Sequence, residues 1–372
     1  MRALSRTGGA DLTEMTQTPN LVSVIVPAYN AARHLRQTLE SIQLQTYPSI
    51  EVLVVDDGST DSTPAIAAEF ARADPRFRVI TQANAGVGAA RNAAVREARG
   101  EYIAPADADD VWYPEKLEKQ VACMRAGGDA VALVYCWFTS IDDEGRVVGY
   151  STRFNVEGWV REAMVFRNFV GNASVPLIRA RILEEVGPYL TRAEQDGGQG
   201  CEDRDLNLRI AERAEFRVVR QYLVKYRQSE TAMSARPQGM ISSFKTVMSR
   251  ARARNTDLPP RIFRWSRGAF FSYQMRKCYR WGNYGWCLRC IGHATIADPV
   301  MLFDIKLYSL LARAAIKGLL RLPPDLRRRW GGGETPESPS PSVVGAGRLE
   351  GPNALYRRIE QRRWMSTVVG RI

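Results

Sequence analysis

The fold is decided by one short stretch, Leu21-Val-Ser-Val-Ile-Val26, which is almost entirely apolar, rich in β-branched residues, and ends at Pro27. A strand with apolar residues at consecutive positions is buried on both faces, as in a parallel sheet covered by helices. A similar run, Ile50-Glu-Val-Leu-Val-Val55, follows a segment from Leu35 to Leu44 whose apolar residues have helical spacing. The sequence therefore predicts a strand, a helix and a second strand over residues 21–55.

The same alternation continues along the chain. We expect helices over 63–72, 84–99, 111–124 and 179–186 and another from 202, and strands over 77–80, 101–104, 130–138, 175–178 and 216–226. Alternating strands and helices are typical of an α/β fold. Ligands of such sheets bind at the carboxyl ends of the strands, so the residues that follow each strand are the candidates for a site.

Two acidic clusters follow strands of this predicted sheet, Asp56-Asp57-Gly58-Ser59-Thr60-Asp61 and Asp107-Ala-Asp-Asp110. Crowded carboxylates repel one another unless a cation is present, and oxygen ligands suit Mg²⁺ or Mn²⁺ held together with substrate phosphates. The alternative is a pair of acidic turns, with Asp110 capping a following helix. Two such clusters at one edge of one sheet favour the metal site.

Arg91 lies in the segment Asn84-Ala-Gly-Val-Gly-Ala-Ala-Arg-Asn92, which opens a helix after a glycine-bearing loop. A helix start of this kind favours anions, so Arg91 is a candidate for contact with a diphosphate. The Gly-Val-Gly is not a dinucleotide fingerprint, because no strand directly precedes it and the third glycine is missing. A glycine-rich segment, 195–200, is expected to be a mobile loop, either a lid over the site or an exposed connection.

Six motifs resemble, in order, those of family 2 glycosyltransferases. They are Val24-Ile-Val-Pro-Ala-Tyr-Asn30, Val54-Val-Asp-Asp-Gly-Ser-Thr-Asp61, the segment 84–92, Gly100-Glu-Tyr-Ile103, Asp107-Ala-Asp-Asp110 and Cys201-Glu-Asp203. The resemblance covers roughly residues 21–230. It implies an inverting enzyme with a GT-A type nucleotide-diphospho-sugar transferase fold, an α/β fold with a Rossmann-like mixed sheet, here followed by a C-terminal helical appendage.

The resemblance also implies a role for each matching residue. Pro27, Ala28 and Tyr29 would line the nucleobase pocket, Asp57 would bind the base, and Arg91 would lie near the base or diphosphate. Asp107 would face the ribose and Asp109 would ligate Mn²⁺ or Mg²⁺. Asp203 would be the general base, with Glu202 as the alternative. One departure is Ala104-Pro105-Ala106, where bulky apolar residues are usual, so we expect the preceding strand to end early.

The domain organisation follows from composition. We expect a flexible extension over 1–19, a catalytic GT-A domain over 20–235, a basic helical region over 240–330, a disordered linker over 331–353 and a basic tail over 354–372. The net charge of +12 is concentrated in one block, because residues 245–330 hold 18 Lys and Arg against 4 Asp and Glu, a balance of 18 − 4 = +14. Neither a signal peptide nor a long apolar span is apparent in the sequence, so the expected location is cytoplasmic.

The basic block suggests a polyanionic partner. The segment 301–322 is amphipathic with a basic rim, which fits either a helix on an anionic membrane surface or a helix packed on its own domain. We therefore expect a nucleotide-sugar donor, a glycan or lipid-linked acceptor in cell-surface polysaccharide synthesis, and peripheral association with the inner face of the membrane. Nucleic acid is not an expected partner, because no nucleic-acid-binding fold is recognisable.

Two other functions deserve comparison. A metal-dependent nucleotidyltransferase would need a glycine-rich triphosphate loop after the first strand, where this chain has Pro27-Ala-Tyr-Asn30. A catalytically inactive sugar-nucleotide-binding or scaffold protein would not need the carboxylates, all of which are in place. Cys287, Cys290 and His293 would be half a zinc site, and without a second ligand pair nearby we expect free thiols.

Overall fold

The computed structural model describes residues 17–195, 197–230, 232–319 and 361–363. Within these ranges nine strands form one mixed sheet in the order β3-β2-β1-β4-β8-β6-β9-β5, and β7 pairs with β6. The strands are β1 (Thr18–Ala28), β2 (Ile50–Asp56), β3 (Phe77–Thr81), β4 (Gly100–Pro105), β5 (Val111–Trp112), β6 (Val131–Ile141), β7 (Val147–Tyr150), β8 (Leu177–Arg179) and β9 (Glu215–Arg227). β1 to β4 pair in parallel, whereas β8 is antiparallel to both β4 and β6.

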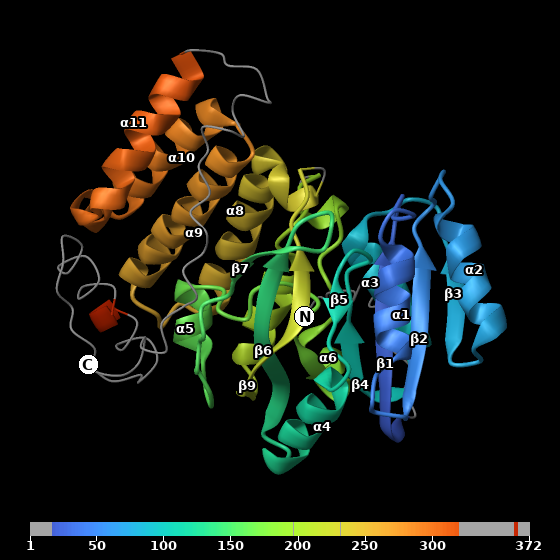
Figure 1. The fold of residues 1–372 in the computed structure, drawn as a ribbon. Coiled ribbons are helices and arrows are strands. Elements are labelled where there is room, and N and C mark those ends of the chain that lie inside the picture. Colours follow the sequence, from blue (N-terminus) through green and yellow to red (C-terminus); the bar gives the residue numbers. More distant parts are fainter. Residues whose placement is uncertain (1–16, 196, 231, 320–360, 364–372) are drawn as a thin grey trace, which may run out of the picture.

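Helices connect these strands and pack against the sheet (Figure 1). They are α1 (Leu35–Gln43), α2 (Thr63–Ala73), α3 (Val87–Glu97), α4 (Lys116–Ala126), α5 (Arg161–Phe166), α6 (Arg181–Val186) and α7 (Glu202–Ala211), with a short 3₁₀ turn, η1, at Ala193–Gln195. The predicted α/β fold is confirmed. Residues 22–26 are buried throughout, as expected of a strand with apolar residues on both faces.

The carboxyl ends of β1, β2 and β4 meet at one edge of the sheet. Ala28 at the end of β1 pairs with Asp56 at the end of β2, and Ile25 pairs with Pro105 at the end of β4. The two acidic clusters, which begin at Asp56 and Asp107, therefore start from the two strands that flank β1.

Three local predictions were wrong. β4 does not end early but continues to Pro105, and the missing N–H of Pro105 is tolerated because the pairing of β4 with β8 involves only Tyr102 and Ile103. The predicted helix over 111–124 is instead strand β5 followed by α4 from Lys116, because a residue before proline, here Tyr113 before Pro114, disfavours helix. β1 begins at Thr18, inside the predicted flexible extension 1–19, of which residues 1–16 lie outside the described part.

Beyond β9 the described chain is helical, after a short turn η2 (Met233–Ala235). α8 (Pro237–Arg254), α9 (Pro260–Arg280), α10 (Tyr284–Ala297) and α11 (Ile305–Leu319) lie side by side at the β6–β9 end of the molecule (Figure 1). α8 packs on α7 and α9 packs on α5, and Phe244 of α8 stacks on Phe270 of α9 with 3.8 Å between ring centroids. We call α8 to α11 the helical region.

The predicted amphipathic helix over 301–322 is divided in the structure. A 3₁₀ turn, η3 (Pro299–Phe303), precedes α11, whose first turn is capped by Asp304 accepting the Lys306 N–H at 3.1 Å. The predicted linker 331–353 lies outside the described residues, as does the tail 354–372 except for 361–363. No helix in the described ranges is long and apolar enough to cross a membrane.

Candidate active site

The loops after β1 and β2 are held together by side chains. Asn30, whose φ of 47° is in the left-handed region, accepts the Thr60 N–H at 2.9 Å, and Asp61 accepts the Ala32 N–H at 3.1 Å. These contacts fix two loops that begin at neighbouring strand ends and leave little freedom for either to move alone.

Asp57 is buried and accepts hydrogen bonds from a third loop, residues 82–86. Its Oδ1 accepts from Gln82 Nε2 at 2.7 Å and from the Ala85 N–H at 2.9 Å, and its Oδ2 accepts from the Gly86 N–H at 2.8 Å. Gly86 has a φ of 91°, a conformation that L side chains rarely adopt. Asp57 thus shapes the loop that leads into α3.

Of the three residues predicted to line a base pocket, two are buried within the sheet. Pro27 and Ala28 belong to β1 and pair with β2, whereas Tyr29 follows the strand and is 52% exposed. Tyr29 is therefore the member of this group whose ring is available to a ligand.

Arg91 of α3 joins both acidic parts of the site. Its Nη2 donates to Asp107 Oδ1 at 2.6 Å and its Nη1 donates to Glu202 Oε1 at 2.9 Å, and the Tyr189 ring lies 5.5 Å from its guanidinium carbon. The side chain is only 2% exposed. Burial alone would lower the pKa of Arg91, but Asp107 and Glu202 outweigh it and hold the arginine protonated.

α3 can approach this closely because of Gly88, where a Cβ atom would lie 2.1 Å from the Leu190 carbonyl oxygen. Asn92 completes the contact by exchanging two 2.8 Å hydrogen bonds with the backbone of Tyr189. The segment that carries Tyr189 is thereby fixed against the helix that carries Arg91.

The loop 107–110 is supported by two residues from distant parts of the chain. Ser174 Oγ donates to Asp110 Oδ2 at 2.5 Å and accepts the Asp107 N–H at 2.9 Å. Arg227, at the end of β9, donates its N–H to Asp110 Oδ1 at 2.8 Å and its Nε to the Asp109 carbonyl at 2.8 Å. Asp110 is therefore tied to Ser174 and β9 and does not cap α4, which begins six residues later.

Two carboxylates of this loop, Asp109 and Asp110, form no ion pair among the described residues, although the charge of Arg227 lowers the pKa of Asp109. Burial, and next the charge of Asp107, raise the pKa of Asp109 to about 7. Burial, and next the charge of Asp109, raise the pKa of Asp110 well above its usual range. A site that destabilises its own negative charge in this way attracts a positive ligand.

Glu202 and Asp203 begin α7 and differ in their contacts. Both carboxylate oxygens of Glu202 are engaged, Oε1 by Arg91 and Oε2 by the Gly200 N–H at 2.8 Å. Asp203 forms no ion pair in the described part of the chain. Burial, and next the charge of Glu202, raise the pKa of Asp203 to about 7, although Arg91 lowers it.

Sequence reasoning missed four supporting residues, namely Gln82, Ser174, Tyr189 and Arg227. Ser174 and Tyr189 lie in irregular segments with no motif, and Gln82 follows a strand without a distinctive neighbour. Arg227 carried a weak signal, since it is a charged residue placed where a predicted strand ends.

Residues 23–176 match the family described as glycosyl transferase family 2. This part of the chain is a family 2 glycosyltransferase domain. Over 104 residues the chain is 42% identical to YibD, an uncharacterized glycosyltransferase of Escherichia coli, a match covering 28% of this chain and 30% of YibD. Over 199 residues it is 33% identical to Escherichia coli chondroitin synthase, covering 53% of this chain and 27% of the synthase.

The fold extends beyond that domain. S. aureus TarS, solved with UDP-GlcNAc, superposes with a TM-score of 0.56 and 20% identity, covering 80% of this chain and 88% of the TarS chain. The fold is accordingly of the GT-A type, as predicted. The chain spans about a third of the length of the curated relatives it matches.

The family 2 domain fits a divalent metal ion that is held jointly by protein carboxylates and substrate phosphates. Within the described ranges no three His, Cys, Asp or Glu side chains are grouped to hold a metal by themselves. Mg²⁺ and Mn²⁺ are commonly held by one or two carboxylates together with substrate phosphates. The raised pKa of Asp109 and its position beside Asp107 fit such a shared site.

The glycine-rich segment is packed against the helical region. Ser243 of α8 accepts the Cys201 N–H at 3.1 Å and donates to Gln195 Oε1, and a Cβ at Gly198 would lie 2.9 Å from the Ser243 nitrogen. Among the described residues of the loop, Gln195 and Gly198 are buried beside α8, whereas Gly197 is exposed. α8 thus supports the start of α7, where Glu202 and Asp203 lie.

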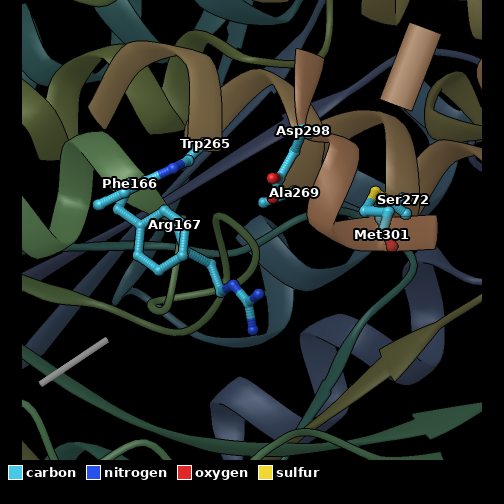
Figure 2. A pocket seen from close by; sticks show the side chains of 8 residues that line it. Phe166, Arg167, Trp265, Ala269, Ser272, Asp298 and Met301 are labelled. Atoms are coloured by element: carbon cyan, nitrogen blue, oxygen red, sulfur yellow. The ribbon is translucent and has the colours of Figure 1, made fainter. Parts of the chain in front are cut away.

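Arg204, the next residue of α7, extends this support to α5 and α9. Its buried Nη2 donates to the Val165 carbonyl at 3.2 Å and to Ser266 Oγ at 2.9 Å, and its guanidinium carbon lies 5.0 Å from the centroid of the Phe244 ring. A small cavity of about 20 Å³ lies nearby, lined by side chains that include Phe166 of α5, Trp265 of α9 and Asp298, the N-cap of η3 (Figure 2). It has room for about one water molecule and includes no predicted site residue.

Proposed function

We propose that the chain is a glycosyltransferase that moves a sugar from a nucleotide-diphosphate sugar, a UDP-sugar, onto a hydroxyl acceptor with inversion at the anomeric carbon. The observation that carries this proposal is the pair of ion pairs made by Arg91, to Asp107 at 2.6 Å and to Glu202 at 2.9 Å. They bring the acidic loop after β4 next to the start of α7. A donor-binding group and a proton acceptor can then serve one substrate.

On the donor side, Tyr29 offers an exposed ring on which a base can stack, and Asp57 shapes the loop beside it. Asp107 would face the ribose, and Asp109 would hold Mn²⁺ or Mg²⁺ together with the diphosphate. Such an ion, when bound, offsets the negative charge that develops on the diphosphate. Arg91 would hold Asp107 and Glu202 in position rather than bind the substrate itself, because both of its Nη atoms are already engaged by these carboxylates.

On the acceptor side, Asp203 is the proposed general base. It would accept the proton of the acceptor hydroxyl while that oxygen attacks the sugar, and the hydroxyl oxygen replaces the diphosphate oxygen at the anomeric carbon. A pKa of about 7 suits this role because a base works best when its pKa lies near the working pH. Glu202 is less suitable, since Arg91 and the Gly200 N–H occupy its oxygens.

For the acceptor we propose a lipid-linked glycan of a polysaccharide pathway, met at the cytoplasmic face of an anionic membrane. Two observations support this. One matching relative is named for the synthesis of a polysaccharide, chondroitin. The basic excess of the chain lies in the helical region, next to the proposed acceptor side rather than spread over the domain.

The test is calorimetric binding of UDP and GDP, with and without Mn²⁺, to the wild-type chain and to Asp109→Ala, followed by analysis of donor turnover. Mn²⁺-dependent UDP binding that is lost in the variant supports the proposal, as does release of UDP from a UDP-sugar. A preference for GDP would overturn the UDP assignment. Folded protein that binds neither nucleotide would favour a scaffold, and release of pyrophosphate from a nucleoside triphosphate would favour a nucleotidyltransferase.

A further inference from the structure

Half of the large apolar side chains that are exposed in the described residues lie in one short segment. Outside the segment they are scattered along the chain, whereas seven fall between residues 296 and 316 and are between 40% and 81% exposed. They lie at the end of α10, in η3 and along α11: Ile296, Leu302, Phe303, Ile305, Tyr308, Leu311 and Ile316. We call these seven residues the apolar ridge.

The ridge residues that belong to α11 lie on the face of that helix that points away from the protein. Leu307, Leu310 and Ala314 are buried and form the inner face, whereas Ile305, Tyr308 and Ile316 recur at helical spacing on the outer face. α11 packs on α10 and is the outermost helix of the helical region (Figure 1). The helix therefore has two apolar faces, and only one of them is covered by the described protein.

The charges beside the ridge have one sign. Lys306 and Arg313 are exposed and lie seven residues apart, which places them two turns apart along one flank of α11. The two acidic residues between 258 and 319 are Asp298 and Asp304, and both are buried. No carboxylate is therefore exposed in that segment.

Asp298 is neutralised from within the chain. Its Oδ1 accepts from Arg363 Nη2 at 2.9 Å, its Oδ2 accepts from Arg363 Nη1, and the guanidinium carbon of Arg363 lies 4.8 Å from the centroid of the Trp265 ring. Figure 2 shows Asp298 among the side chains that line the small cavity between α9 and η3. Asp298, the N-cap of η3, is therefore buried and paired with Arg363, and it adds no exposed negative charge beside the ridge.

We propose that the apolar ridge binds the surface of an anionic lipid bilayer, with the ridge side chains at the boundary of headgroups and acyl chains. Lys306 and Arg313 contact lipid phosphates from the flank. An exposed apolar face beside basic side chains, on a helix too short and too polar to span, is the pattern of an interfacial helix. A second copy is a poorer occupant, because it would bring the same basic flank against itself.

The biological role of this membrane binding rests on the proposed function, since binding would hold the enzyme where a lipid-linked acceptor is found. The evidence for the binding is separate, namely the exposure and charge of residues 296–316. The two can therefore be tested apart.

The experiment is co-sedimentation of the full chain with vesicles of phosphatidylcholine alone and of phosphatidylcholine with about 30% phosphatidylglycerol. We expect binding to the mixed vesicles that weakens about 25-fold in Lys306→Gln/Arg313→Gln, at about fivefold for each charge. Phe303→Ser/Ile305→Ser is expected to lose binding by at least about tenfold. Matched controls are Leu44→Ser, an exposed apolar residue at the end of α1, and Arg96→Gln, an exposed arginine of α3, both of which should bind as the wild type does.

Equal binding by wild-type and ridge variants would overturn the proposal. A wild-type dimer in light scattering that the Phe303→Ser/Ile305→Ser change converts to monomer would also overturn it and make the ridge a self-interface. UDP binding, measured in parallel, separates the two ideas. A ridge variant that binds UDP but not vesicles supports the membrane surface, whereas a wild type that binds vesicles but not UDP leaves that surface intact and defeats the proposed function.

Discussion

Arg91 and Glu202, which are 111 positions apart in the sequence, form a buried ion pair with 2.9 Å between Nη1 and Oε1. The same guanidinium binds Asp107, so one arginine connects the loop after β4 to the first turn of α7. A buried arginine whose two nitrogens face two carboxylates cannot be removed without leaving both of them unpaired. One residue, Arg91, thus holds the two acidic parts of the candidate site together.

Arg91→Met is expected to lower the free energy of unfolding by about 3–5 kcal/mol, because a buried carboxylate is left without its counter-ion. Urea unfolding measures the change, and Mn²⁺-dependent UDP binding should weaken in parallel as the 107–110 loop loses its support. The control is Arg36→Met, which removes an exposed pair with Glu69 and should leave both measurements unchanged. A fully stable Arg91→Met chain would show that the ion pairs contribute little.

Asp203→Asn and Glu202→Gln are expected to fail in different ways. The Asn variant should keep its stability and UDP binding but lose about 10²–10⁴-fold in turnover, since it cannot accept a proton. The Gln variant should instead unfold at lower urea concentration, because Arg91 loses a charged partner. If Glu202→Gln abolished turnover in a stable chain and Asp203→Asn did not, the roles would be reversed.

The pH dependence of turnover follows from the same residue. The pKa of Asp203 is raised to about 7, mainly by burial and by Glu202, against the opposing charge of Arg91. Its deprotonated form is the base, so turnover at saturating donor and fixed Mn²⁺ should rise with pH up to about 7 and level off above it. A profile already flat at pH 5 would place the essential base elsewhere.

Lys116 is expected to destabilise the chain at neutral pH. Its ammonium lies 3.8 Å from the centroid of the Trp112 ring with no hydrogen-bond partner among the described residues, and burial lowers its pKa to about 8. The unfolded chain therefore binds more protons between about pH 8 and 10, so folding stability contributed by this group rises with pH across that window.

Lys116→Met should accordingly raise the free energy of unfolding at pH 7 by about 1–3 kcal/mol, and the gain should shrink toward pH 10. Lys119→Met on the same helix changes a more exposed lysine and should stay within about 0.5 kcal/mol of wild type. A Lys116→Met chain that is less stable at pH 7 would reveal a partner for the ammonium.

Gly88→Ala tests the close approach of α3 to the segment that carries Leu190, and Gly292→Ala in α10 is the control. A Cβ at Gly88 would lie 2.1 Å from the Leu190 carbonyl oxygen, so this change should cost about 1–3 kcal/mol and weaken UDP binding. Gly292 lies in α10 with open space around it, and alanine there should stabilise by up to about 1 kcal/mol. Thermal unfolding of both variants against wild type makes the comparison.

The order of strands and helices and the edge that carries the acidic clusters could be predicted from sequence, because apolar periodicity and strand ends are local signals. The partners of the charged residues could not. The helix start predicts that Arg91 contacts an anionic ligand, but no local signal indicates its pairing with Asp107 and Glu202, which only the folded chain brings close. The helix expected over 111–124 shows the opposite case, since Pro114 was a local signal that the apolar pattern obscured.

The position of Arg227 in the sequence determines when the site can form during synthesis of the chain. It is the last residue of β9, and it fixes the backbone of Asp109 and the carboxylate of Asp110, which leave the ribosome more than a hundred residues earlier. A nascent chain that has emerged only as far as the end of the family match, residue 176, contains the acidic loop without this support and without Glu202 and Asp203. The proposed catalytic centre is therefore assembled late, and we expect premature termination before β9 to yield a fragment that matches the family but has an incomplete site.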